Sequence, residues 1–419
     1  MIRKLLLFAL MVSFTASSNS RVINLPNNII NGKNVLQQSM MDEKCVEYRV
    51  RSAFDLEGQT ILLPEGSYLS FTASGSLNNG TIVGQNSFIK ASKSNCIFNR
   101  IIIQGTWSVP NIFSEWFDFS DNSTQNRVNF KNLVGLTDGI HHSTILIAAG
   151  SYPIRLDKGN ETCMSLKSNT KILLNGTLKL EPNDLPSYRI IYINKLNDVT
   201  ICGKGLIIGD VEKHFGDMGQ WGMGIWIKDS RNVVLKDVTI CNCWGDCIYI
   251  GQSNYSRDCF SENILIKNVT CSASRRQGLS IISGKNIRIV NSRFCNIGTI
   301  KFTRPGHGID IEPNIRGGAV TENIVIKRCI FDGNKKSDFS TYNLDSTALI
   351  VVKNCVFPKK VTFSHNSCNI TMKNCDIFKL NCHSDTVNNI VIKNSKIQNV
   401  LSGKIPTGVY LKNCATAGH

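Results

Sequence analysis

The sequence predicts an all-β protein whose short parallel strands stack into a solenoid. Three observations support this prediction. A motif of Asn, alternating apolar residues, Lys and a second Asn recurs, with small departures, from residue 232 onward. The intervals between its seven copies range from 20 to 37 residues, which indicates one structural unit with loops of variable length. No copy is long enough to bury its own apolar face, so the copies must pack on one another.

The copies of the motif place like residues in columns along the stack. They begin at Asn232, Asn263, Asn286, Asn323, Leu349, Asn369 and Asn389. Stacked strands lie about 4.8 Å apart, so equivalent residues of successive coils come into register. Asn tolerates left-handed backbone and its amide can bond the amide of the next coil, so we expect these Asn residues at a repeated turn. Cys329, Cys355 and Cys375 follow a second turn and are expected to form an inward stack.

A column of lysines is expected to face outward from the same strands. Its members are Lys236, Lys267, Lys327, Lys353, Lys373 and Lys393. One interpretation is a solvated edge that discourages pairing with another strand. The other is a rail for a polyanion, since like charges at the spacing of the coils repel one another and are screened by salt.

The composition limits the partners of the chain. Lys and Arg number 47 against 31 Asp and Glu, a net charge of +16 that attracts polyanions over a long range. Acidic polysaccharide, nucleic acid and anionic membrane all suit this charge, but no nucleic-acid-binding module is recognisable, so no nucleic-acid partner is expected. The 16 Cys form no CxxC pair and no zinc-ribbon spacing, so we expect buried thiols that fill core positions. We expect a monomer.

The repeats resemble the pectin-lyase-like superfamily, together with the segment NGTLKLEPNDLPSYRIIYINKLNDVTICGKGLIIGD ahead of them. The resemblance implies a single-stranded right-handed parallel β-helix with three strands per coil over residues 136–419. Residues 21–115 contain further short strands and Gly turns and are expected to form a β-rich N-terminal cap or extra coils. Residues 116–135 are aromatic and then helix-like, so we expect a plug over one open end, where it would cover terminal strand edges.

Residues 1–20 have the layout of a cleaved secretory signal peptide. They have a basic start, an apolar run from Leu5 to Phe14 and a small polar end. That run is too short to span a bilayer, and no later stretch is long enough to form a membrane span. The mature protein is therefore expected to be secreted or periplasmic.

The variable intervals contain the remaining strand of each coil. Aligned apolar pairs give GIWIK at 224–228, CIYIG at 247–251, GLSII at 278–282 and GIDIE at 308–312. Alternation points their apolar pairs inward, namely Ile225 and Ile227, Ile248 and Ile250, Leu279 and Ile281, and Ile309 and Ile311. One outward column is then Trp226, Tyr249, Ser280 and Asp310, and the next is Lys228, Gly251, Ile282 and Glu312. The turn positions before the strands are Met223, Asp246, Gln277 and His307, with Arg276 beside Gln277.

Long insertions flank these four strands before Gly224, after Tyr249 and before Gly308. Because binding clefts need loops on a rigid scaffold, we expect a groove between about residues 210 and 320. Aromatic side chains near this groove are candidates for stacking on sugar rings, and the groove itself suits a polysaccharide. These aromatics are Trp221, Trp226, Trp244 and Tyr249.

Carboxyl groups near the groove suggest glycoside hydrolysis as the reaction. That chemistry uses a carboxylic acid and a carboxylate, about 6.5 to 9.5 Å apart for inversion or about 5 to 5.5 Å for retention. Asp310 and Glu312 lie two residues apart on one strand face, roughly 6 to 7 Å between Cα atoms. Asp246 lies two coils away, before the strand, and is the third candidate catalytic residue. Arg276, Gln277 and His307 are candidates for binding the substrate.

A local resemblance bears on these residues. GDCIYIG, RRQGLSIIS and GIDIE are similar in order and coil position to the Asp-Asp, Gly-His-Gly and Arg-Ile-Lys motifs of the polygalacturonase family. On that match Asp246 takes the place of a catalytic Asp. Gly245 replaces its partner, Gln277 replaces the His, and acids replace the Arg and Lys that bind a sugar carboxylate. The resemblance implies a site at this position and argues against polygalacturonate as the substrate.

Two other classes of function remain open. A lyase or uronate epimerase would use Arg276 or His307 near the proton, with Ca²⁺ held by Asp246, Asp310 and Glu312. The hydrolase needs no cofactor and no metal. A carbohydrate-binding or adhesive solenoid without turnover is the third class, because a fold alone does not establish chemistry.

Overall fold

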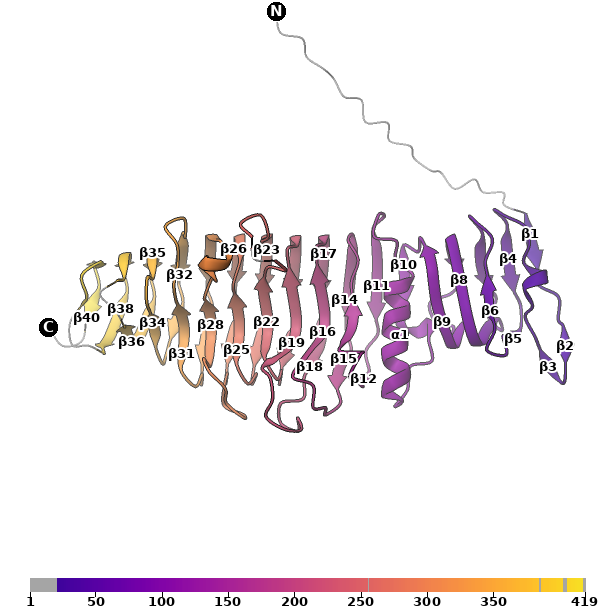
Figure 1. Cartoon of the computed structure of the whole chain (residues 1–419), viewed down its shortest axis with the longest axis horizontal. Helices are drawn as coiled ribbons and strands as arrows, with labels where there is room; N and C mark the ends of the chain where they lie inside the picture. The colour runs from indigo at the N-terminus through magenta and orange to yellow at the C-terminus, as the bar shows by residue number, and fades with distance from the viewer. Residues whose placement is uncertain (1–20, 255, 384–385, 402–404, 417–419) are drawn as a thin grey trace, which may run out of the picture.

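The computed structural model describes residues 21–254, 256–383, 386–401 and 405–416 of the chain. The expected signal peptide, residues 1–20, lies outside the described residues. The chain forms an elongated rod in which successive strands follow one another along the long axis (Figure 1). Parallel pairing dominates throughout, as the repeats predict; the hairpin of β2 (Ile29–Ile30) and β3 (Lys33–Asn34) is antiparallel.

The rod begins with a seven-stranded sheet. Its strands are β1 (Val22–Asn24), β4 (Glu47–Val50), β5 (Ala53–Asp55), β6 (Thr60–Leu62), β7 (Tyr68–Phe71), β8 (Ser76–Lys90) and β9 (Phe98–Trp107). The short helix η1 (Gln38–Met40) lies between β3 and β4 in the sequence. These strands continue the same stacking mode, because β4 pairs in parallel with β7 and β7 with β8.

The rest of the rod contains two long parallel sheets. One is a 12-stranded sheet made of β10 (Asn111–Phe113), β11 (Ser143–Ile147), β14 (Thr170–Leu174), β17 (Asn197–Cys202), β20 (Arg231–Lys236), β23 (Ser261–Lys267), β26 (Gly284–Val290), β29 (Thr321–Lys327), β32 (Ile350–Lys353), β35 (Cys368–Lys373), β37 (Asn388–Lys393) and β39 (Val409–Lys412). The motif copies found in the sequence lie on this sheet. It starts at Asn111, upstream of the boundary expected near residue 136.

The other long sheet has 19 strands in two parallel rows. The first row is β12 (Ser151–Ile154), β15 (Thr177–Leu180), β18 (Leu206–Ile208), β21 (Thr239–Cys241), β24 (Thr270–Ser272), β27 (Arg293–Cys295), β30 (Ile330–Asp332), β33 (Val356–Phe357), β36 (Asp376–Cys382), β38 (Lys396–Val400) and β40 (Ala415–Thr416). The second row, which we call the site row, is β13 (Thr162–Ser165), β16 (Ser187–Asn194), β19 (Trp221–Lys228), β22 (Asp246–Gly251), β25 (Gln277–Ile281), β28 (His307–Ile311), β31 (Ser337–Thr341) and β34 (Val361–Phe363).

The helix α1 (Ser123–Gly135) follows the aromatic helix η2 (Ser114–Trp116) in the segment expected to be a plug. Asn122 caps the helix by accepting a hydrogen bond from the backbone N–H of Gln125. The helix packs against β9, β12 and β13. It therefore lies between the N-terminal sheet and the long sheets, part-way along the rod, and not over a free end (Figure 1).

Register confirms the columns derived from the sequence. Trp226 pairs with Tyr249, Tyr249 with Ser280 and Ser280 with Asp310. Asp246 pairs with Gln277. The apolar residues expected to point inward on these strands are fully buried. The side chains of the outward column are thus brought together from segments up to 84 positions apart in the sequence (310 minus 226).

The Asn columns occupy left-handed turns, as predicted. Asn263, Asn286 and Asn323 have φ values of 56°, 53° and 53°. Side-chain amides bond from coil to coil, for example from Asn323 Nδ2 to Asn286 Oδ1 at 2.7 Å. These residues stabilise the turns.

Replacing Asn323 with alanine is expected to lower the free energy of unfolding by about 1–2 kcal/mol, because alanine pays the steric cost of left-handed backbone and loses the amide bond. Asn323→Gly keeps the backbone freedom and is expected to lose less. Thermal unfolding followed by circular dichroism should rank the parent above the glycine variant and the glycine variant above the alanine variant. Equal losses in both variants would contradict a role for the left-handed turn.

Half of the cysteines are buried thiols as predicted, whereas six are partly exposed and Cys45 and Cys96 are exposed. All 16 are free in the structure. Cys329, Cys355 and Cys375 are nearly inaccessible to solvent and stack on successive coils, where the backbone N–H of Cys329 lies 3.4 Å from Cys355 Sγ. Sulfur therefore fills the corner of the core after these three turns.

Candidate functional site

Two loops, residues 209–220 and 296–306, lead into β19 and β28 of the site row. Arg275 joins these loops, because its Nη1 donates to the carbonyl of Gly219 at 2.8 Å and its Nε donates to the carbonyl of Lys301 at 2.8 Å. The loops lie before Gly224 and before Gly308, where the sequence predicts the walls of a groove. They are fixed to each other rather than left apart as two separate walls.

Asp246 lies at the start of β22. Its side chain is fully buried, and its Oδ2 accepts hydrogen bonds from Arg276 Nη1 at 2.8 Å and from Ser280 Oγ at 2.7 Å. Its Oδ1 has no hydrogen-bond partner within the described part of the chain. A buried carboxylate with one unsatisfied oxygen is costly to a fold, so this arrangement calls for a functional explanation.

Asp310 lies one column away on β28 and is 3% exposed. Its Oδ2 accepts a hydrogen bond from Gln277 Nε2 at 2.6 Å. Gln277 is itself fixed, because its Oε1 accepts from the backbone N–H of His307 at 2.9 Å. Gln277, on the preceding coil, therefore orients Asp310.

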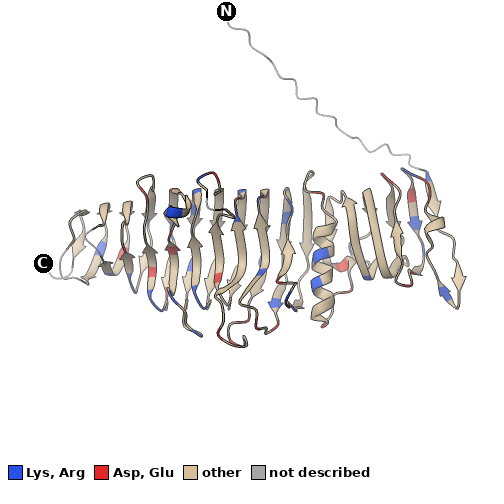
Figure 2. Cartoon of the chain, viewed as in Figure 1, with Lys and Arg blue, Asp and Glu red and all other residues tan. Residues whose placement is uncertain are grey.

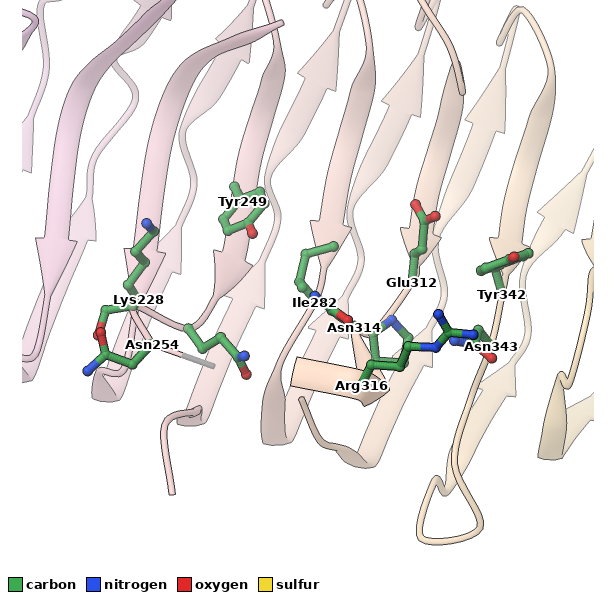
Figure 3. Close-up of a pocket in the computed structure, with 12 residues that line it drawn as sticks. Lys228, Tyr249, Asn254, Ile282, Glu312, Asn314, Arg316, Tyr342 and Asn343 are labelled. Atoms are coloured by element: carbon green, nitrogen blue, oxygen red, sulfur yellow. The ribbon is translucent and has the colours of Figure 1, made fainter. Parts of the chain in front are cut away.

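Glu312 follows β28 and is the carboxyl group of this cluster that reaches an open pocket. The pocket has a volume of about 500 Å³ and is lined by Lys228, Tyr249, Gln252, Ser253, Asn254, Ile282, Glu312, Pro313, Asn314, Arg316, Tyr342 and Asn343. Figure 3 shows Glu312 and Tyr342 on neighbouring strands, with Ile282 on the strand between Glu312 and Tyr249. Asp246 and Asp310 do not line this pocket.

Burial raises the pKa of all three carboxyl groups. It raises the pKa of Asp246 to about 6, against the opposing charge of Arg276 and the hydrogen bond from Ser280. It raises the pKa of Asp310 to about 6 against Arg276 and Gln277. Burial and then the charge of Asp310 raise the pKa of Glu312 to about 7. Groups with pKa values moved toward neutrality by burial and by a neighbouring carboxyl are typical of acid–base sites.

Arg276 is the cation that these carboxyl groups share. Burial alone lowers the pKa of its guanidinium, but the charges of Asp246, Asp310 and Glu312 outweigh burial and raise it. Arg276 therefore stays protonated and cannot serve as a base.

The same cation does not suit a calcium site among the three acids. A guanidinium 2.8 Å from Asp246 would repel a dication placed on these oxygens. In the part of the chain that the structure describes, no group of three or more His, Cys, Asp and Glu side chains is arranged to hold a metal ion.

His307 is half-buried at the start of β28 and acts as an acceptor, since its Nδ1 lies 3.2 Å from the backbone N–H of Ser337. Burial lowers the pKa of His307 to about 3, with further lowering by Lys360, Lys336 and Arg276. The imidazole is therefore neutral across the physiological range. A base with so low a pKa is a weak acceptor of a sugar proton near neutral pH.

The structure does not offer two of the four expected aromatic platforms to a substrate. Trp244 is fully buried between His214, whose ring stacks on it with centroids 3.7 Å apart, and Arg275, whose guanidinium lies 3.6 Å from its ring centroid. Trp226 is 8% exposed and packs beside the cations of Arg189 and Lys228. Cations and neighbouring rings occupy the space around both tryptophans, so both act as packing residues.

Tyr249 and Trp221 remain accessible. Tyr249 lines the pocket and makes an edge contact with Trp226, with ring centroids 5.4 Å apart. Trp221 begins β19 and is 46% exposed. It does not line the pocket that contains Glu312.

Sequence reasoning missed the other wall of this pocket. Tyr342 and Asn343 follow β31, and Asn314 and Arg316 belong to the turn around helix η3 (Ile315–Gly317). The outward column that contains Ile282 and Glu312 continues to Tyr342, whose backbone N–H donates to the carbonyl of Ile311. The alternating segment SDFSTY at 337–342 carries the same signal as GIDIE and could have extended the predicted site by one coil.

A family model matches part of the chain and agrees with the parallel sheets of the structure. Residues 223–389 match the family model described as "Right handed beta helix region". The fold is a right-handed parallel β-helix. Its strands pair with partners three places along the chain, as β19 does with β22 and β22 with β25.

Relatives of the β-helix include "Uncharacterized protein YclG" of Bacillus subtilis (strain 168), which is 29% identical over 248 residues. That match covers 54% of this chain and 42% of the relative, so the chain spans less than half the length of the curated relatives it matches.

Among solved structures, the β-helix is similar to a polygalacturonase from Erwinia carotovora ssp. carotovora. The identity is 16% and the TM-score 0.48, and the match covers 75% of this chain and 94% of that one. It is also similar to the tailspike protein gp49 of Acinetobacter baumannii bacteriophage Fri1, a capsular polysaccharide depolymerase. There the identity is 12% and the TM-score 0.43, with 74% of this chain and 61% of that one covered.

No helix in the described ranges has the length and apolar character needed to cross a membrane.

Proposed function

We propose that this β-helix is an exported, carbohydrate-active enzyme that hydrolyses a polysaccharide bound across the pocket beside Glu312. The observation that carries the proposal is the pair of carboxyl groups, Asp310 and Glu312, on one strand face. Burial raises the pKa of each, and the two share the cation of Arg276. Two titratable groups whose environments separate their pKa values are suited to acid and base roles in one site.

Glu312 is the general acid in this proposal. Its pKa of about 7 keeps it substantially protonated near neutral pH, and its position in the pocket gives it access to a glycosidic oxygen. Proton transfer to the leaving oxygen would break the bond between the sugar carbon and that oxygen. Tyr249 and Tyr342 flank Glu312 in the pocket and are proposed to hold the sugar rings.

Asp310 is the ionised partner in this proposal. With a pKa of about 6, lower than that of Glu312, it is the first of the two to lose its proton as the pH rises. It would activate a water or attack the sugar carbon directly, and the choice between these depends on the separation of the two carboxyl groups in the substrate complex. Access to Asp310 requires substrate or water to enter beside Glu312, since Asp310 is 3% exposed.

Asp246 is proposed as a positioning residue rather than a group that contacts substrate. Its carboxylate is completely buried and bonds to Arg276, which in turn neutralises Asp310 and Glu312. Gln277 has the corresponding role for Asp310. Asp246 and Gln277 thus hold Arg276 and Asp310 in place without contacting the substrate.

This assignment predicts a bell-shaped dependence of kcat/KM on pH, with a maximum between about pH 6 and 7. Below about pH 6 Asp310 gains a proton and loses its basic function, and above about pH 7 Glu312 loses the proton that it must donate. Initial rates between pH 4 and 9 on a cleaved substrate test the prediction. A rate that climbs steadily into the alkaline range would instead fit proton abstraction from a uronate.

A non-catalytic glycan-binding solenoid is the second candidate. The observation that favours it is the burial of Asp246 and Asp310, whose hydrogen bonds to Arg276, Ser280 and Gln277 give both residues a structural role. In that case the Asp310→Asn variant would bind glycans as the parent does, and neither protein would cleave them.

Digestion of a panel of neutral and acidic glycans, with and without a chelator, separates these functions. The hydrolase is expected to release reducing ends at a rate that the chelator leaves unchanged. A lyase would produce an ultraviolet-absorbing double bond, and an epimerase would change the sugar composition without cleavage. Binding without any product would support the adhesive solenoid.

A further inference from the structure

A second feature of the β-helix lies on the 12-stranded sheet, away from the carboxyl cluster. Lysines occupy the same outward position on five consecutive strands, from β29 to β39. Register pairs Lys327 with Lys353, Lys353 with Lys373, Lys373 with Lys393, and Lys393 with Lys412. Strands in a parallel sheet lie about 4.8 Å apart, so these five charges extend over roughly 20 Å in a straight line.

These charges are not neutralised within the chain. Among the described residues, none of the five lysines forms an ion pair with an acidic side chain. The sheet has ion pairs elsewhere, for example between Lys236 and Asp237 at 3.3 Å and between Lys285 and Glu322 at 3.2 Å. Lysines commonly protect an unpaired strand edge, but β29, β32, β35 and β37 pair with a neighbour on both sides, so four of these lysines lie on the face of a continuous sheet. Five uncompensated charges of one sign in register concentrate a positive field along one line.

A basic hollow continues this line toward the N-terminus. It has a volume of about 660 Å³ and lies on the outer face of β23, β26 and β29. Lys267, Arg288 and Arg328 contribute to its lining, and all three are at least partly exposed. Figure 2 shows that basic residues recur along the length of the rod.

A mostly apolar column runs beside the lysines. The residues two positions before each lysine are Val325, Val351, Thr371, Val391 and Tyr410, and they are also in register. A stripe of positive charge therefore lies parallel to a stripe of small β-branched side chains. A chain of sugar rings has apolar C–H faces and, when acidic, carries negative groups along its edges, so it complements both stripes at once.

We propose that this face, which we call the lysine face, binds a linear acidic polysaccharide lying parallel to the long axis of the β-helix. The face is composed of Lys327, Lys353, Lys373, Lys393 and Lys412, their neighbouring apolar column, and the basic hollow. It belongs to a different sheet from Glu312, so it constitutes a second glycan-binding surface whose existence does not depend on catalysis in the pocket.

The observations favour a glycan over other polyanions. Single-stranded nucleic acid is bound by aromatic side chains that stack on bases, whereas the column beside the lysines contains one aromatic, Tyr410. An anionic membrane is bound by a helix or loop that inserts bulky apolar residues, whereas this face is a flat sheet with β-branched side chains.

The test compares binding of a soluble polyuronate, a neutral glucan of similar length and duplex DNA by the full chain, over a range of salt concentrations. The lysine-face variant is Lys353→Glu/Lys373→Glu/Lys393→Glu. The matched control is Lys158→Glu/Lys179→Glu/Lys204→Glu, which changes the net charge equally at three exposed lysines outside the lysine face. Thermal unfolding of each variant checks that it is folded.

The lysine-face variant is expected to bind polyuronate at least about tenfold more weakly, with a shallower dependence of affinity on salt, because fewer counterions are released. The control should stay within about twofold of the parent. A second variant, with glutamine at the same three lysines, avoids new negative charges and should show an intermediate loss.

The proposal is overturned if the lysine-face variant binds as the parent does, if both triple variants weaken equally, or if duplex DNA binds more tightly than polyuronate at the same salt. Cleavage of short oligosaccharides in the pocket is expected to be unchanged in the lysine-face variant. If the lysine-face variant loses polyuronate binding but still cleaves oligosaccharides, the lysine face and the pocket act separately. If the parent cleaves no glycan but the lysine-face variant still loses polyuronate binding, the lysine face is supported and the proposal concerning Glu312 fails.

Discussion

Replacing Glu312 with glutamine is expected to lower kcat/KM on a cleaved polysaccharide by about a hundredfold to ten-thousandfold, the range typical for loss of a general acid. Glutamine keeps the size of the side chain but cannot donate the proton that the leaving oxygen requires. The fold should be unaffected, because Glu312 is half-buried at the edge of the pocket. Initial rates and the pH profile of the variant provide the measurement.

Glu322→Gln is the matched control. Glu322 lies on β29, its side chain is 48% exposed, and it pairs with Lys285 at the surface. This control should keep the parental rate. If Glu312→Gln and Glu322→Gln both retain full activity, Glu312 is not the acid. If Glu312→Gln loses activity but keeps the parental alkaline limb in its pH profile, that limb belongs to another group.

Replacing Arg276 with methionine is expected to destabilise the β-helix by about 3–5 kcal/mol at pH 8, the range for breaking a buried ion pair from one side. Methionine has a similar length but leaves Asp246 without a counter-charge in a site that excludes water. The side chains of Arg276 and Asp246 are 12% and 0% exposed. The free energy of unfolding, measured by denaturant titration, is the quantity to compare.

The loss should be smaller at pH 5 than at pH 8. In the folded state the pKa values of Asp246, Asp310 and Glu312 lie above their ordinary values, at about 6, 6 and 7. The stability that these groups contribute is therefore present below about pH 4 and is lost as the pH rises through 6 to 7. At pH 5 these three carboxyl groups are mostly protonated and neutral, so removing the Arg276 guanidinium costs less stability.

Two controls define this prediction. Arg293→Met removes a partner of Asp332 in a surface pair with side chains 48% and 60% exposed, and should cost at most about 1 kcal/mol. Asp246→Asn combined with Arg276→Met should cost less than the sum of the two single changes. A loss at pH 5 as large as at pH 8 would contradict the electrostatic explanation.

The columns of this protein could be predicted from its sequence because a parallel solenoid repeats one local rule. Alternation decides which of Ile309, Asp310 and Ile311 points inward, and stacking at a fixed spacing places Asp310 in one column with Ser280 and Tyr249. The Asn turns and the Cys stack follow from the same rule. For segments that follow the repeat, the sequence alone therefore predicts where each side chain lies in the stack.

The loops do not follow the repeat, and the sequence-based predictions that were wrong concern residues next to the loops. The burial of Trp244 depends on His214 and Arg275, which reach it from separate loops. The environment of Asp246 depends on Arg276, an adjacent-coil residue whose direction alternation does not fix. The sequence predicts which strand side chains point away from the core. It does not predict how exposed those side chains are to solvent, because that depends on the loops.

The central claim is that carboxyl groups beside the pocket hydrolyse a glycan. Its most direct test is digestion of the glycan panel in water enriched in heavy oxygen, with mass analysis of the products. Hydrolysis assisted by Glu312 and Asp310 predicts new reducing ends that carry one heavy oxygen atom, and their loss in Glu312→Gln. Unsaturated products without heavy oxygen, or intact glycans that bind but are never cleaved, would contradict it.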